Sequence, residues 1–204
     1  MTTQASPAAI DRLWRWFEHH AHELASGETS LLALIPELEH HLAEVGLPNW
    51  EIGPDDGGGA FFALSPGGKR DVLPETQRVV RQAPQLAGWR FLAAKPPRSW
   101  DLRFSVKTDD GDLDVDGQQW EFVLYRLRSG DFAVAFRPPP QPALSDDDGY
   151  CAAVILVDGE LGEGTRLALI HDIELVTNWG PNDLRVVRLL EPGLLARVLR
   201  AQHH

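Results

Sequence analysis

The segment 121–137 has the sequence EFVLYRLRSGDFAVAFR, and the fold expected for this chain is built outward from it. Two runs rich in aromatic and β-branched residues flank the turn sequence Ser-Gly-Asp at 129–131, a pattern typical of a β-hairpin. The segment 50–64 has the same plan, because a turn-forming run rich in Asp and Gly separates two apolar runs. The chain is therefore expected to contain two hairpins.

Both hairpins open on or directly after the dipeptide Trp-Glu, which occurs at 50–51 and at 120–121. Each hairpin is followed by a helical pattern and then by another strand-like run. The order strand, strand, helix, strand is therefore expected twice, over residues 50–94 and 120–176. Few residues are identical between the two copies, so the repeat is one of architecture rather than of sequence.

The helix and the closing strand of the second copy are less sharply defined than its hairpin. The apolar run Tyr150–Leu161 predicts a buried helix, although its centre, Val-Ile-Leu-Val at 154–157, would also suit a strand. We expect Arg166–Val176 to form one long strand, and a short helix near Pro192–Arg200 to end the chain.

Two amphipathic patterns precede the first copy. Apolar residues recur at steps of three and four from Ile10 to Leu24 and again from Leu31 to Val45, which predicts two helices. Pro36 lies inside the second pattern, so that helix either kinks or starts there. Because the link between the helices is short, we expect an antiparallel helical hairpin.

These elements predict the α+β class, with an N-terminal helical hairpin followed by two strand-strand-helix-strand units in a mainly antiparallel sheet sandwich. The expected divisions are the helical hairpin at 1–47, the first unit at 48–100, and the second unit at 101–204. The second unit has an extra leading strand and a C-terminal helix. All three are expected to form one compact globular unit.

Composition excludes several classes of function. The 204 residues include 19 Lys and Arg and 30 Asp and Glu, a net charge of −11, which argues against binding to a nucleic-acid backbone. The single cysteine excludes an internal disulfide. No apolar run approaches the ~20 residues of a membrane span, and no secretory signal is evident, so we expect a cytoplasmic protein without a membrane partner.

The sequence DLDVDG at 112–117 matches the first half of a calcium loop of the EF-hand type. The second half does not match, because position twelve is Val123 instead of a glutamate. Two interpretations remain open: a calcium site at Asp112, Asp114 and Asp116, or an acidic strand with Leu113 and Val115 facing inward and the aspartates in solvent.

A transition-metal site is a further alternative. Glu37 and His40 have the i, i+3 spacing found in di-metal carboxylate bundles, and His19 and His22 share a face of the first helix. The competing interpretation is a solvated helix face rich in Glu and His. No cofactor is predicted. The terminal His203–His204 is left out of the metal set because a pair of this kind can be a remnant of a purification tag.

The chain contains the kinds of residue that nucleophilic catalysis uses, because Cys151, His171 and Asp172 supply a thiol, a base and an acid. Their flanking sequences support no known catalytic motif, and Cys151 begins an apolar run, which indicates a small buried side chain. The chain also lacks a Gly-x-Ser-x-Gly elbow, a His-Glu-x-x-His helix and a phosphate loop. Whether the chain is an enzyme stays open, and a non-enzymatic function is favoured.

The favoured function is binding to another protein. Three tryptophans fall outside the apolar patterns. Exposed tryptophans are enriched at protein contacts, and packing in the core or at a strand end is the alternative explanation for each of the three. Clustered aspartates suggest a basic partner, as for an inhibitor or an immunity protein. The expected partner-binding residues are Trp16, Trp100, Trp179, Asp109, Asp110, Asp112, Asp114 and Asp116. A third alternative is a small-ligand module in which Arg126, Arg128 and Arg137 face an anion.

The pattern as a whole resembles a family of bacterial proteins with a domain of unknown function. The resemblance rests on the leading helix around 14–17, the helix at 31–42, the segments WEIGP at 50–54 and APQLAGW at 83–89, and the following Phe91 and Arg98. It covers about residues 10–175 and is loose after that. It implies a bacterial origin and a shared α+β fold, and it assigns no activity or site residues.

Overall fold

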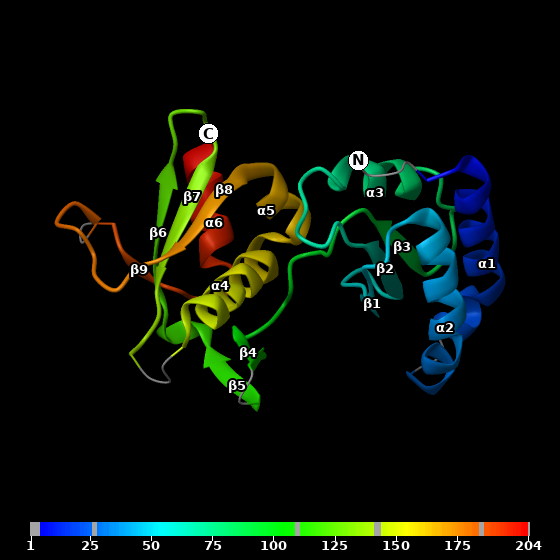
Figure 1. Cartoon of the computed structure of the whole chain (residues 1–204), viewed down its shortest axis with the longest axis horizontal. Helices are drawn as coiled ribbons and strands as arrows, with labels where there is room; N and C mark the ends of the chain where they lie inside the picture. The colour runs from blue at the N-terminus through cyan, green and yellow to red at the C-terminus, as the bar shows by residue number, and fades with distance from the viewer. Residues whose placement is uncertain (1–4, 26–27, 109–110, 141–143, 184–185, 204) are drawn as a thin grey trace. The chain divides into compact units, whose positions relative to one another are not determined.

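The computed structural model describes residues 5–25, 28–108, 111–140, 144–183 and 186–203. Within these ranges it contains six α-helices and nine strands in mixed sheets, which confirms the α+β class with a leading helix pair (Figure 1). The chain divides into two compact units, Met1–Lys95 (unit 1) and Pro96–His204 (unit 2).

Unit 1 opens with helices α1 (Pro7–Ala25) and α2 (Glu28–Val45). The helices are antiparallel, since Arg12 near the start of α1 pairs with Glu44 near the end of α2. Helix α2 runs through Pro36, so the alternative that the helix starts at this proline is wrong. Packing of its apolar face, including the fully buried Leu38 and Leu42, outweighs the loss of one backbone hydrogen bond at the proline.

The rest of unit 1 is a sheet with one short helix. Its elements are β1 (Trp50–Pro54), β2 (Ala60–Leu64), α3 (Leu73–Val80) and β3 (Trp89–Leu92). The strand order is β1-β2-β3, with an antiparallel first pair and a parallel second pair. Two indole N–H groups link helix α1 to the rest of unit 1. Trp14 of α1 donates to the backbone carbonyl of Val79 in α3, and Trp89 of β3 donates to that of Ala21 in α1.

Unit 2 repeats this topology in a larger form (Figure 1). Its repeated elements are β6 (Glu121–Arg126), β7 (Phe132–Arg137), α4 (Asp146–Leu161), α5 (Glu163–Leu169) and β8 (Ile170–Leu175). Strand β6 pairs antiparallel with β7, and β7 pairs parallel with β8. The short β9 (Arg188–Leu189) adds to the other edge of β6, and α6 (Leu194–His203) follows.

The expected long strand at 166–176 is wrong in its first part, because residues up to Leu169 belong to helix α5. Gly162 separates α4 from α5 at a φ of +79°, a conformation that glycine adopts without strain. Leu167 and Leu169 are two residues apart, which is the spacing of a strand, and this local pattern misled the prediction because the structure keeps both residues in α5. Tyr150–Leu161 is helical, as predicted.

Within unit 2, an antiparallel pair, β4 (Arg103–Thr108) and β5 (Gly111–Asp116), precedes β6 and is followed by one 3₁₀ turn at Gly117–Gln119. Val106 and Val115 are buried, while Asp112 and Asp114 are exposed. This alternation confirms the interpretation of 112–116 as an acidic strand.

Among the residues that the structure describes, no helix has the length and apolar character needed to cross a membrane.

Candidate functional site

A cleft of about 670 Å³ opens in unit 2 where the parallel strands β7 and β8 end. Ligand sites in open α/β sheets favour this position, because the chain segments that leave neighbouring strands diverge there. One wall is the proline run 138–140, and another is the start of α4. The lining residues are Gln119, Glu121, Arg137, Pro138, Pro139, Pro140, Leu144, Ser145, Asp146, Leu175, Val176 and Thr177.

Glu121, at the start of β6, anchors the polar side of this cleft. It lies directly opposite Arg137 in the strand register, and the guanidinium donates to its Oε2 from Nε at 3.0 Å and from Nη2 at 2.7 Å. The indole of Trp179, in the segment after β8, donates to the same oxygen at 2.6 Å. These hydrogen bonds, that from Arg137 above all, hold the pKa of Glu121 below its ordinary value.

A smaller hollow of about 160 Å³ adjoins the cleft and shares Gln119, Pro139 and Leu144 with it. Asp114 and Asp116 line this hollow. The two cavities together therefore carry four carboxylate side chains, from Asp114, Asp116, Glu121 and Asp146. Among the described lining residues Arg137 is the one cationic side chain, and Glu121 already binds it.

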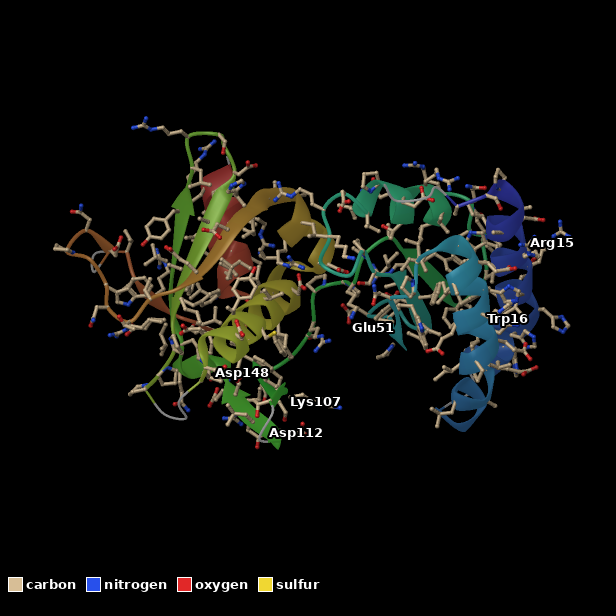
Figure 2. All side chains as sticks on the ribbon, in the orientation of Figure 1. Arg15, Trp16, Glu51, Lys107, Asp112 and Asp148 are labelled. Carbon is tan, nitrogen blue, oxygen red and sulfur yellow. The ribbon has the colours of Figure 1, made fainter. Side chains whose placement is uncertain are left out.

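The aspartates of β5 have partners on the neighbouring strand β4. The hydroxyl of Ser105 donates to Asp114 at 2.7 Å, and Arg103 lies 3.7 Å from the carboxylate of Asp116. Lys107 and Asp112 face each other in the strand register, and both are labelled in Figure 2. Part of the negative charge of this strand is therefore balanced locally.

The second half of a calcium loop is missing here, because residue 123 is a buried valine of β6. Asp109 and Asp110, the other two aspartates expected to bind a partner, lie outside the described residues.

The three tryptophans expected at a partner surface are half-buried. The Trp16 indole donates to the carboxylate of Glu37 at 2.9 Å, and Trp179 binds Glu121 as described. Trp100 packs against Phe104, and its indole nitrogen is buried with no hydrogen-bond partner among the described residues. Of the three, Trp179 is the one tied to the cleft.

The transition-metal alternative rests on four residues of the helix pair, namely Glu37, His40, His19 and His22. In the part of the chain that the structure describes, no three His, Cys, Asp or Glu residues form a group that could hold a metal ion. Glu37 accepts a hydrogen bond from the indole of Trp16, which is labelled on α1 in Figure 2. His19, His22 and His40 lie on the same helix pair, and their role as ligands stays a prediction.

Sequence reasoning missed a different histidine pair. The rings of His20 and His41 flank Trp16, with centroids 4.9 Å and 5.6 Å from the indole. Both Nδ1 atoms are buried, and neither has a hydrogen-bond partner among the described residues. Burial lowers the pKa of His41, against the raising effect of Glu44. The i, i+4 spacing of Trp16 and His20 was the available signal.

Cys151 is exposed, so the prediction that it is a small buried side chain is wrong. It lies at the solvent-facing side of α4, beside the exposed Tyr150, whereas Ala152 and Ala153 face the core. His171 is exposed on β8, and no hydrogen bond joins it to Cys151 within the described ranges. The structure therefore places the thiol and the base on different elements without a catalytic contact.

The cleft uses only part of what the sequence singles out. Arg126 is exposed at the end of β6, so of the three arginines of the small-ligand alternative Arg137 is the one that lines the cleft. Glu121 and the proline run were visible in the sequence, but nothing in their spacing marked a cleft. Comparison of the sequence with protein-family models gave no match, and comparisons with curated proteins and with solved structures gave none either.

Proposed function

We propose that this chain is a non-enzymatic protein of the bacterial cytoplasm that binds a basic protein partner through the cleft of unit 2. An inhibitor or immunity protein is one form that this function would take. The observation that carries the proposal is the imbalance of charge in the lining, where four carboxylates meet one guanidinium that Glu121 already neutralises.

The charge of unit 2 as a whole supports the same partner. Its sequence holds 18 Asp and Glu against 11 Lys and Arg. Asp147 and Asp148 follow Asp146 in the first turn of α4 and add to the negative charge of this helix start, where Figure 2 labels Asp148. A negative rim around a partly apolar cleft attracts a cationic surface during encounter and disfavours an anionic one.

The test uses a fluorescent oligo-arginine peptide as the probe and measures its affinity as salt rises from roughly 0.01 to 1 M, over which the screening length falls about tenfold. We expect binding that weakens steeply with salt. The double variant Asp146→Asn, Asp147→Asn should bind several-fold more weakly than the wild type. The matched control Glu18→Gln, Glu39→Gln removes the same charge from exposed sites in unit 1.

Two results would contradict the proposal. One is an affinity that does not change with salt. The other is an equal loss of affinity in the cleft variant and in the control, because net charge alone would then explain the binding.

A further inference from the structure

A specific acceptor for the partner can be identified within this cleft, and the argument rests on the function proposed above. The donors around Glu121 are distributed unevenly between its two oxygens. Nε and Nη2 of Arg137 and Nε1 of Trp179 all converge on Oε2. Oε1 receives no hydrogen bond from any described residue, although Glu121 lines the cleft.

The side chain of Glu121 is held in place before any ligand arrives. Strand pairing fixes its backbone opposite Arg137, and the indole of Trp179 is a further donor that holds the carboxylate. A carboxylate held in this way loses little conformational entropy when a further donor binds to it. Its side chain is about 29% exposed, so a ligand can reach it while part of the surrounding water is displaced.

The surroundings of Glu121 match the shape of a long basic side chain. Pro138, Pro139, Leu144 and Leu175 supply an apolar lining, against which the methylene stem of an arginine or lysine packs well. Asp146, at the start of α4, also lines the cleft and adds a negative charge that Arg137 does not pair with. The cavity volume is within the range of sites that hold small ligands or a few side chains.

We propose that Oε1 of Glu121 is the anchor for a guanidinium or ammonium group of the partner protein, whose aliphatic stem lies along the proline wall. Arg137 has two opposing effects in this arrangement. It positions the carboxylate, and its positive charge competes with the incoming cation.

The experiment uses short peptides blocked at both ends that differ only in a central arginine, lysine or glutamine, with affinity measured by calorimetry. The arginine and lysine peptides should bind at least about tenfold more tightly than the glutamine peptide, which is the scale of one charge-assisted hydrogen bond. The ratio of the first two affinities identifies which basic side chain the anchor prefers.

Variants separate the anchor from general electrostatics. Glu121→Gln should weaken the arginine peptide about tenfold, whereas Glu191→Gln, at an exposed site in the same unit, should change it less than about twofold. Arg137→Gln should strengthen binding several-fold, because the amide can still donate to Glu121 while the competing charge is gone. A structural defect would change affinity in the opposite direction.

A measurement on the unaltered protein covers the case in which Glu121→Gln does not fold. The indole N–H resonance of Trp179, assigned by its loss in Trp179→Phe, should shift when the arginine peptide is added. The two proposals can fail separately. If oligo-arginine binding depends on Asp146 and Asp147 but the indole resonance does not respond and Glu121→Gln has no effect, Glu121 is not the anchor and the proposed function still stands. Absence of binding by every basic peptide would overturn both.

Discussion

Glu160 in α4 offers a sharp test of how unit 2 is held together. Its side chain is 6% exposed, and its two carboxylate oxygens accept the backbone N–H groups of Gly193 at 2.8 Å and Leu195 at 3.2 Å. Gly193 directly precedes α6 and Leu195 lies in its first turn, where helical N–H groups lack partners within the helix. Glu160 therefore docks the C-terminal helix onto α4.

The expected cost of Glu160→Ala follows from these contacts. Each buried N–H left without a partner costs about 1–3 kcal/mol, and the desolvation of the buried carboxylate in the wild type offsets part of that loss. We expect a loss of about 3 kcal/mol in the free energy of unfolding of unit 2. With a urea dependence of about 2 kcal/mol per molar, the midpoint should fall by about 1.5 M. Amide NMR signals of β6 and β7 report this transition.

Glu160→Gln is the matched control, because its amide oxygen can still accept one of the two N–H groups, and it should lose about half as much. A pH series adds an independent check. Burial raises the pKa of Glu160 above its ordinary value of 4.5, so the folded state holds the proton longer than the unfolded state. The contribution of Glu160 to the free energy of unfolding should therefore fall as pH rises from 4.5 through the raised pKa of the folded state. The Gln variant should lack this dependence on pH.

A loss below about 1 kcal/mol for Glu160→Ala, or equal losses in the Ala and Gln variants, would contradict this role of Glu160. Either result would mean that α6 is held by its apolar contacts alone.

Three further predictions concern other parts of the chain. Gly159→Ala should destabilise unit 2 by about 2 kcal/mol in thermal unfolding, because the added Cβ would overlap the indole ring of Trp100; unchanged stability would show that this ring does not pack on α4. Between pH 7.5 and 5.5 the variant His41→Gln should lose less stability than the wild type. Burial lowers the pKa of His41 from its ordinary value of 6.5, so the unfolded state takes up the proton first as pH falls. A wild type that gains stability on acidification would show that the pairing of His41 with Glu44 dominates. Thermal unfolding should not respond to a chelator or to added calcium, manganese, zinc or iron, whereas a metal at a hundred times its dissociation constant would add about 2.7 kcal/mol and would favour the metal alternative.

The hairpins could be predicted from sequence because their signals are local. At 121–137 a turn sequence, aromatic residues and strand periodicity all favour the same structure, and the observed strands agree with it. The segment 166–169 lacked such agreement, because the i, i+2 spacing of its leucines favours a strand, whereas the structure places these residues in helix α5. The prediction that Cys151 is buried was wrong for a related reason, because an apolar run does not indicate which positions of a helix face the core.

The cleft could not be predicted, because it depends on contacts between residues far apart in the chain. Trp179 reaches Glu121 across 58 positions, and the register of β6 against β7 brings Arg137 to the same carboxylate. Residue types indicated an acidic protein with available tryptophans. They could not indicate that Arg137 and Trp179 would both donate hydrogen bonds to the same oxygen of Glu121.

The repeated topology explains why the proposed site belongs to the second copy. Glu51 and Glu121 occupy comparable places in their strands, but the register sets Ala63 opposite Glu51 and Arg137 opposite Glu121. Glu51, labelled in Figure 2, instead has Lys95 at 3.8 Å, from beyond the last strand of its unit. The parts that complete the cleft in unit 2 lie at or beyond the ends of the repeated strands. They are Arg137 at the very end of β7, the proline run 138–140 and Trp179. The repeat therefore supplies a scaffold with a glutamate at one edge, and the connecting segments of unit 2 turn that glutamate into a fixed acceptor facing a cavity.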